Sequence, residues 1–157
     1  AYFFGAQAQT DAFFLGYKRL DLRPGELVDA LHISADRGDA RFNFEKVSKR
    51  THLDIASVNT AISLRLEDGR IAGAALAAGG VAPIPRRLPR TEAALTGRTP
   101  DAATARAAAA AARGEVAPIS DVRGSADYKR LLLGQLVLAH FNLLFGLEDG
   151  LVAEAGA

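Results

Sequence analysis

The length, composition and charge of the chain indicate one globular unit and exclude several kinds of site. The 157 residues are 49% hydrophobic, which suits one complete domain plus a fragment and argues against a disordered chain. The sequence has no cysteine, so disulfides, thiolate catalysis and cysteine-ligated zinc or iron-sulfur clusters are excluded within it. Its formal net charge is +1, with both signs interspersed, which indicates neither a nucleic-acid nor a membrane partner. It also has no methionine, and we expect it to be a piece of a longer product.

The N-terminal segment has the pattern of the end of a folded unit. An aromatic cluster at 13–17 is followed by the turn signal Pro24-Gly25-Glu26 and by an apolar run that predicts a strand at 27–33. Residues 34–40 are rich in Asp and Gly, which is typical of a loop. We therefore expect the chain to divide into three parts, at 1–33, 34–146 and 147–157, the last being a tail.

The clearest local signal is a two-residue period from Ala56 to Leu66, where apolar and polar side chains alternate as in a half-buried strand. Asp68-Gly69 then favours the positive φ angles of a tight hairpin turn. The small residues from Arg70 to Gly79 predict the returning strand. Because such small side chains cannot fill space alone, we expect a helix to lie close against this strand.

A further strand is expected before this hairpin, and a break in the sheet after it. Phe42 and Phe44 share one face with Lys46, which predicts a first strand that pairs with the hairpin. Gly79-Gly80 and Pro83-Ile84-Pro85 are expected to end the sheet, because proline removes a ladder donor and glycine loosens the backbone.

Three helices are expected in the second half of the chain. A short helix is predicted at 91–95, and an alanine-rich helix at 102–113, with Thr99 as a capping residue and Gly114 as its stop. Ser125 is expected to cap the third helix, which is long and apolar over a wide face. We expect the alanine-rich helix to pack on the strand of small residues.

The order of these elements favours one fold class. All expected strands precede the three helices, which favours an α+β fold: an antiparallel sheet of three to four strands packed against about three helices on one face. The apolar runs are interrupted well before the roughly 20 residues that span a bilayer, so no membrane-spanning helix is expected.

Few side chains form a recognisable chemical pattern. The three histidines are far apart and lack the spacing of metal ligands, so no metal site is expected. No serine has the context of a nucleophile elbow, and no strand leads through a glycine-rich loop of the phosphate-binding type into a helix. The arginines at 86, 87 and 90 suit a phosphate, but a solvated loop beside a helix start is the favoured interpretation.

Several charged residues cluster after the first expected strand, at Lys46, Lys49, Arg50 and Asp54. A lysine offers a mobile donor to an anion or to an electron-rich ring, whereas Arg50 and Asp54 can pair to fix a loop. The residues alone favour the structural pairing, and by themselves they define no more than an α+β domain.

Three segments, in this order and spacing, resemble the C-terminal part of the flavoprotein module of the molybdenum hydroxylases: FEKVSKRTHLDIASVNTAISL, AALAAGGVAPIPRRLPRTEAALTG and PISDVRGSADYKRLLLGQL. The earlier DAFFLGYKRLDLRPGEL resembles the end of the preceding FAD-binding domain, which extends the likeness from Asp11 to about Phe141. Within the family, the nearest resemblance is to the small (iron-sulfur/FAD) subunit of bacterial xanthine dehydrogenase. It implies a sandwich like the CO dehydrogenase flavoprotein C-terminal domain, with residues 1–33 as the end of the FAD-binding domain.

The resemblance implies that the chain helps to enclose FAD. Electrons would reach the flavin from a molybdenum centre through iron-sulfur clusters, and NAD would accept hydride from it. Lys46 matches the family lysine that approaches the flavin ring, where a cation stabilises the negative charge that develops on reduction. Val28 matches an apolar position beside the flavin. The implied cofactor-binding residues are therefore Lys46 and Val28, and no residue is implied to be catalytic. The remaining matches are interpreted as structural junctions: Arg50, Asp54, Ser120, Asp121, Arg123, Ser125 and Tyr128.

The resemblance also implies an oxidoreductase that acts only within a larger assembly. The expected partners are an upstream iron-sulfur/FAD segment, which would carry the remaining FAD-binding loops, and a subunit that binds the molybdopterin. We expect a cytoplasmic hetero-oligomer that hydroxylates purines. Two alternatives are another molybdenum hydroxylase, of the CO dehydrogenase or aldehyde oxidase type, and a non-catalytic assembly module that has lost cofactor binding.

Overall fold

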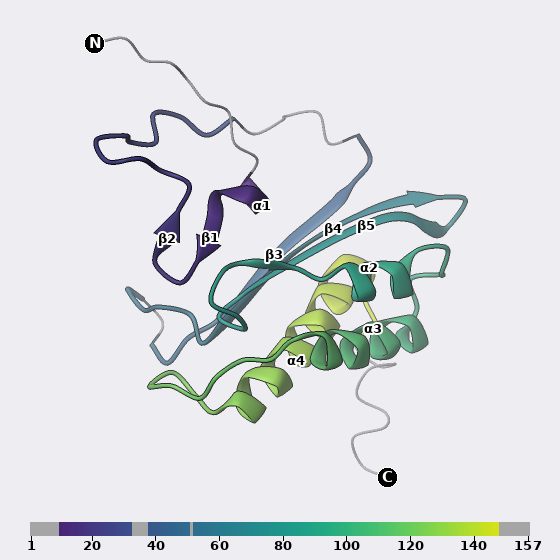
Figure 1. The fold of residues 1–157 in the computed structure, drawn as a ribbon. Helices are drawn as coiled ribbons and strands as arrows, with labels where there is room; N and C mark the ends of the chain where they lie inside the picture. The colour runs from purple at the N-terminus through teal and green to yellow at the C-terminus, as the bar shows by residue number, and fades with distance from the viewer. Residues whose placement is uncertain (1–9, 33–37, 51, 148–157) are drawn as a thin grey trace.

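The computed structural model describes residues 10–32, 38–50 and 52–147, most of which form an antiparallel sheet with helices on one face (Figure 1). The strands of this sheet are, in order, β3 (Arg41–Val47), β4 (Val58–Glu67), β5 (Arg70–Gly79) and β6 (Arg86–Arg87). The helices on that face are α2 (Pro89–Leu95), α3 (Ala102–Glu115) and α4 (Ala126–Phe145), of which α2 and α4 pack directly on the sheet. Before the sheet come a short helix α1 (Thr10–Phe13) and a small hairpin of β1 (Phe14–Gly16) and β2 (Arg19–Leu20). The expected α+β fold is confirmed.

The β4–β5 hairpin forms where the sequence predicts it. Glu67 pairs with Arg70 across a two-residue turn, in which Asp68 and Gly69 have φ angles of 49° and 74°. Positive φ at both central residues matches the right-handed twist of the flanking strands, which is why Asp-Gly favours this turn. The turn fixes the register of the two longest strands, and with it the faces of the sheet.

A bulge in β5 changes which of its residues face the core. Arg65 pairs with Gly73 but Leu66 pairs with Ile71, so Ala72 is an extra residue in β5. An extra residue reverses the alternation of side chains on one side of the bulge. Ile71 is therefore fully buried in the same core as Leu76, on the face opposite to Gly73. Simple alternation along β5 would instead have put Ile71 on the same face as Gly73.

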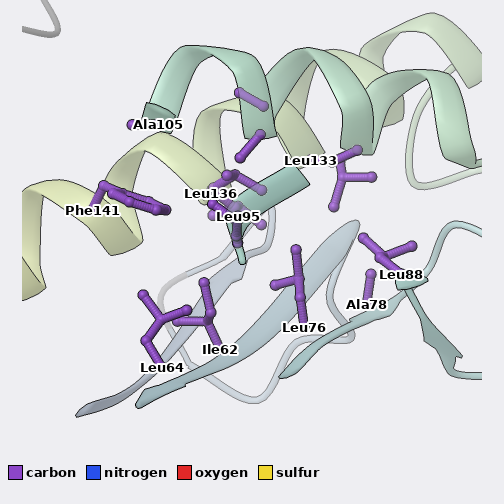
Figure 2. Close-up of a cluster of buried hydrophobic side chains, with 14 of the residues drawn as sticks. Ile62, Leu64, Leu76, Ala78, Leu88, Leu95, Ala105, Leu133, Leu136 and Phe141 are labelled. Carbon is purple, nitrogen blue, oxygen red and sulfur yellow. The ribbon is translucent and has the colours of Figure 1, made fainter. Parts of the chain in front are cut away.

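The core lies between the sheet and the helices. Apolar side chains of β4 and β5 point towards α2 and α4, as Figure 2 shows for Ile62, Leu64 and Leu76 against Leu95 and Phe141. Helix α4 packs on β3 and β4, whereas α2 packs on β5. The apolar face of the hairpin is turned towards these helices because its burial there is the main contribution to the stability of the fold. No helix of the described residues is long and apolar enough to cross a membrane.

The alanine-rich helix α3 lies outside this first layer. It packs mainly against α4 and α2, through a buried row of alanines, and the expectation that it packs on the small-residue strand was wrong. At its end, the Glu115 carboxylate accepts 2.8 Å hydrogen bonds from the backbone N–H groups of Arg90 and Thr91. The N–H groups in the first turn of a helix have no partner within the helix. The N-cap residue of α2, Leu88, has no side-chain acceptor for them, and Glu115 supplies one. Glu115 thus binds α3 to α2, and α2 covers β5 in place of α3.

Two strand expectations fail because pairing depends on distant partners. Residues 27–32 have no regular secondary structure, and residue 33 lies outside the described residues. An extended segment is not stable as a strand without a neighbour, and no described strand pairs with it. The sheet also does not end at Gly79-Gly80, because Arg86 and Arg87 return to pair with Ala78 and Ala77 as the edge strand β6.

The helix boundaries follow local capping. Ser125 caps α4 as expected, accepting a 3.1 Å hydrogen bond from the Tyr128 backbone N–H. Helix α3 is capped by Asp101, which accepts from the Thr104 N–H at 2.8 Å, and not by Thr99. Asp101 directly precedes the helix, where its carboxylate reaches the free N–H groups of the first turn. Gly114 does not stop α3, which continues to Glu115.

Candidate functional site

The face of the sheet opposite to the helices carries an aromatic edge. Phe42 and Phe44 on β3 are 49% and 52% exposed, while Asn43, between them, faces α4. Their cross-strand neighbours on β4 are small, since Phe42 pairs with Ser63 and Phe44 with Ala61. We call this surface the open face. Its members are Phe42, Phe44, Lys46, Asn59, Ala61, Ser63, Ala75, Ala77 and Gly79.

Lys46 ends the aromatic row and is held by the loop that follows its strand. Its Nζ donates a 2.7 Å hydrogen bond to the backbone carbonyl oxygen of Asp54. An ammonium group has three donors, so two of them can still bind an anion, an acceptor atom or water. The sequence predicts a mobile cation here. In the structure, one hydrogen bond orients the Lys46 ammonium group at the edge of the open face.

The β3–β4 loop, residues 48–57, is fixed by an acid–base pair; residue 51 lies outside the described residues. Arg50 donates its backbone N–H to Asp54 Oδ2 at 2.9 Å, and its guanidinium Nη2 lies 3.5 Å from Oδ1. Desolvation tends to raise the pKa of Asp54, but the hydrogen bonds and charge of Arg50 outweigh it and lower that pKa. Arg50 and Asp54 pair as the favoured interpretation predicted, and the pair shapes the loop that holds Lys46.

A second loop, residues 119–125, is anchored by a lysine within α4. Lys129 is only 2% exposed, and its Nζ lies 2.7 Å from Asp121 Oδ2 and donates to the Ile119 carbonyl at 2.9 Å. Asp121 Oδ1 accepts from the Arg123 N–H at 2.9 Å. The hydrogen bond from Lys129 is the main cause that lowers the pKa of Asp121. The 119–125 loop is therefore built around one buried ammonium group.

The two loops are joined by hydrogen bonds between residues far apart in sequence. Lys49 Nζ donates to the Val122 carbonyl at 2.7 Å, and Ser57 Oγ donates to the Arg123 carbonyl at 2.9 Å. Lys49 lies near the start of the β3–β4 loop and Ser57 lies at its end. The loop that orients Lys46 is thus held at both ends by the 119–125 loop.

Sequence reasoning missed Lys129, although a signal for it is present. Lys129, Leu133 and Val137 follow one another at four-residue steps in α4, and all three are buried. A lysine at helical spacing with core residues indicates a buried cation, which requires a partner acid. Asp121, in the matched segment before the helix, is that partner.

His140 belongs to a buried hydrogen-bond network under β3 and β4. Its Nδ1 lies 2.9 Å from Asn43 Nδ2 and its Nε2 lies 2.7 Å from Thr60 Oγ1. The Asn43 amide nitrogen can only donate, so Nδ1 accepts and the proton of the neutral ring is on Nε2. Burial lowers the pKa of His140 to about 4, although the charge of Glu45 acts to raise it. This network connects α4 to the sheet, and the described residues contain no His/Cys/Asp/Glu group suited to a metal.

Of the arginines at 86, 87 and 90, Arg87 makes a structural ion pair. Arg87 Nε lies 2.7 Å from Glu92 Oε1, which also accepts from the Leu76 backbone N–H at 2.8 Å. Glu92 thereby joins α2 to β5 and β6. The geometry supports the structural interpretation of Arg87 over a phosphate site.

The two residues that the resemblance implied at a flavin lie in different parts of the chain. Val28 is 50% exposed in the irregular segment 27–32, not in the expected strand, whereas Lys46 is in β3. The hydrogen bond from Lys46 Nζ to the Asp54 carbonyl brings Lys46 together with the β3–β4 loop. In Figure 1 the segment with α1, β1 and β2 lies on the side of the sheet away from α2, α3 and α4.

The fold and the matched sequence together place the chain in the class of flavoprotein domains of molybdenum hydroxylases. Residues 44–143 match the family described as the CO dehydrogenase flavoprotein C-terminal domain. Because the match covers more than half of the chain, the chain belongs to this family.

Individual relatives agree on the family and differ in the reaction. The sequence is 30% identical over 133 residues to the carbon monoxide dehydrogenase medium chain of Hydrogenophaga pseudoflava, covering 85% of this chain and 46% of that protein. Xanthine dehydrogenase of Drosophila pseudoobscura pseudoobscura is 36% identical over 81 residues, covering 50% of this chain and 6% of that protein. The preference for xanthine dehydrogenase is therefore not established, since that likeness is partial.

Solved structures show the same fold. The carbon monoxide dehydrogenase from Hydrogenophaga pseudoflava that lacks the Mo-pyranopterin moiety matches with a TM-score of 0.73 and 31% identity, over 87% of this chain and 47% of that chain. Quinoline 2-oxidoreductase from Pseudomonas putida 86 matches with a TM-score of 0.73 and 26% identity, over 89% of this chain and 47% of that chain. The chain thus spans about half the length of the medium chain and of these structural relatives.

The described residues can form part of a binding site for FAD, the cofactor that the family implies. The open face offers the Lys46 ammonium group, one of whose three donors binds the Asp54 carbonyl within the described residues, beside two half-exposed aromatic rings. This donor set suits the edge of a flavin ring, which becomes electron-rich on reduction. Within the described residues, no strand leads through a glycine-rich turn into a helix, as a pyrophosphate site of that type would require.

Proposed function

We propose that this chain is the C-terminal portion of the FAD-binding component of a molybdenum hydroxylase, and that it supplies one side of the flavin site. The supporting observation is the position of Lys46, inside the matched region and on the open face, with its ammonium group oriented by the Asp54 carbonyl. Val28 is proposed as an apolar contact of the same cofactor. FAD supplies the redox chemistry when bound, accepting electrons and passing them on.

The proposed role of Lys46 is electrostatic. Reduction adds negative charge to a flavin ring, and an ammonium group at its edge stabilises that charge. The hydrogen bond to Asp54 reduces the conformational freedom that Lys46 would otherwise lose on binding the cofactor. The chain positions and tunes the flavin, and no residue of it takes part in bond making.

The proposed assembly is supported by the relatives, which include the carbon monoxide dehydrogenase medium chain of Hydrogenophaga pseudoflava. This chain has no cysteine to bind iron-sulfur clusters, so these are assigned to an upstream segment or a companion chain. Molybdopterin is assigned to a further subunit, and NAD is proposed as the final acceptor. We propose only the class of reaction, an oxidation catalysed by a molybdenum hydroxylase, and not its substrate. Purine oxidation of the xanthine dehydrogenase type and CO oxidation are two forms of it, and the relatives favour the latter at least as strongly.

The role of Lys46 is tested in the purified enzyme complex by titrating the bound flavin with dithionite against a reference dye. Lys46→Ala should lower the equilibrium constant for flavin reduction by about tenfold or more, because one nearby positive charge is lost. Lys46→Arg should retain most of that constant. As a matched control, Arg98→Gln removes an exposed cation that lies beside Ile71, at the end of the hairpin opposite to Lys46, and should leave the constant unchanged. An unchanged constant in Lys46→Ala, with FAD still bound, would refute this role.

A further inference from the structure

We propose that the ion pair between Asp121 and the buried Lys129 is a positioning device for Lys46, acting through the two joined loops. The inference rests on the proposed function, because it assigns these residues to the same flavin site. Neither residue lies on the open face, and neither is proposed to touch the cofactor.

The first step is the cost of burying Lys129. An ammonium group removed from water is tolerated only where it is paired and hydrogen-bonded, and the Lys129 side chain is only 3% exposed. The Asp121 carboxylate at 2.7 Å and the Ile119 carbonyl at 2.9 Å meet this requirement. Because α4 is fixed in the core, Lys129 sets the position of Asp121 relative to the sheet.

The second step is the turn that Asp121 starts. Asp121 and Gly124 exchange backbone hydrogen bonds of 3.0 and 3.1 Å. Gly124 has a φ of 152°, and a Cβ there would lie 2.7 Å from Cδ1 of Tyr128, so the turn packs directly against the first turn of α4. The residues between them, Val122 and Arg123, are thereby held with their carbonyl groups towards the β3–β4 loop.

The third step transfers this position to Lys46. The Val122 carbonyl holds Lys49, and the Arg123 carbonyl holds Ser57. Between these two points the loop carries Asp54, whose carbonyl accepts from Lys46. Hydrogen bonds, joined by short stretches of backbone, therefore connect the core of α4 to the ammonium group on the open face. Lysine is a long side chain with four flexible bonds, so such support decides where its charge lies.

The inference is tested in the purified complex with the same dithionite titration and with three variants. Asp121→Asn weakens the ion pair to the buried Lys129, and Lys49→Met removes the hydrogen bond to the Val122 carbonyl at an exposed residue without disturbing the core. The matched control, Asp127→Asn, removes an exposed carboxylate from the same helix. We expect Asp121→Asn and Lys49→Met to lower the equilibrium constant for flavin reduction by about two- to thirtyfold, the range of coupling through a packed network. Asp127→Asn should have no effect.

A double-mutant cycle separates positioning from a general loss of stability. If Lys49 acts through Lys46, adding Lys49→Met to Lys46→Ala should lower the constant no further. Backbone amides of the β3–β4 loop should also exchange faster with solvent in Asp121→Asn and Lys49→Met. The positioning role would be overturned if the effects of Lys49→Met and Lys46→Ala were additive. It would also be overturned if Lys46→Ala lowered the constant while Asp121→Asn and Lys49→Met left it unchanged. Either result would leave the proposed function standing. No effect of Lys46→Ala, or a complex without flavin, would overturn both.

Discussion

Gly80 packs directly against the backbone carbonyl of Ser57, so that a Cβ at position 80 would overlap the carbonyl oxygen. Gly80 also has a φ of 82°, a conformation that side chains with a Cβ rarely adopt. The chain leaving β5 therefore crosses closely over the residue that enters β4. This contact lies beside the junction of the two loops, because the Ser57 side chain donates to Arg123.

Gly80→Ala should destabilise the fold by about 1–3 kcal/mol, through backbone strain and the overlap with Ser57. Gly114 offers a matched control, since it lies inside α3 with open space around its Cα. Gly114→Ala should stabilise the protein by about 0.5–1 kcal/mol. Urea unfolding followed by circular dichroism measures both changes. Equal effects of the two substitutions would contradict the close contact.

Capping of α3 gives a second prediction. Asp101→Ala should lower the free energy of unfolding by about 1 kcal/mol, because the Thr104 N–H loses its acceptor. The pKa of Asp101 is lowered mainly by the hydrogen bond from the Thr104 backbone, so this stabilisation is lost in acid as the carboxylate is protonated. Thr99→Ala should have a much smaller effect. If Thr99→Ala proved as costly as Asp101→Ala in urea unfolding, Asp101 would not be the dominant cap.

His140 predicts a pH dependence of stability. Its pKa is about 4 in the folded protein and 6.5 without burial, so the unfolded chain binds more protons between these values. Stability should therefore be fully present above pH 6.5 and fall by about 3 kcal/mol as the pH is lowered to about 4. The free energy of unfolding, measured from pH 7.5 to pH 4, checks this.

Two variants identify the group responsible for that dependence. His140→Gln should lower stability at pH 7 but remove most of the slope between pH 6.5 and 4. His52→Gln, which changes an exposed histidine, should retain the slope. A slope that persists unchanged in His140→Gln would assign the titration to another group.

The sequence predicts elements whose causes are local. The Asp68-Gly69 turn and the Ser125 cap depend on neighbouring residues, and both occur as expected. The 27–33 strand and β6 depend on pairing partners elsewhere in the chain, and here the expectation and the structure differ. The place of α3 depends on Glu115 reaching the start of α2, a contact that periodicity does not reveal.

The candidate site shows the same division. The pairing of Arg50 with Asp54 follows from their spacing and was predicted. Lys129 was missed because its role requires knowing that the 119–125 loop folds back on α4 and then contacts Lys49. The assignment of Lys46 and Val28 to a flavin comes from family resemblance, and it is still a prediction.

The central claim, that this chain is part of the flavin component of a molybdenum hydroxylase, is tested most directly by purifying the complex that contains it. Its intact mass, absorbance spectrum and molybdenum content should be measured together. We predict flavin absorbance bands on an iron-sulfur background, molybdenum, and a larger parent or companion chain. A colourless, stable species that contains this chain alone would contradict the claim and favour a non-catalytic assembly module.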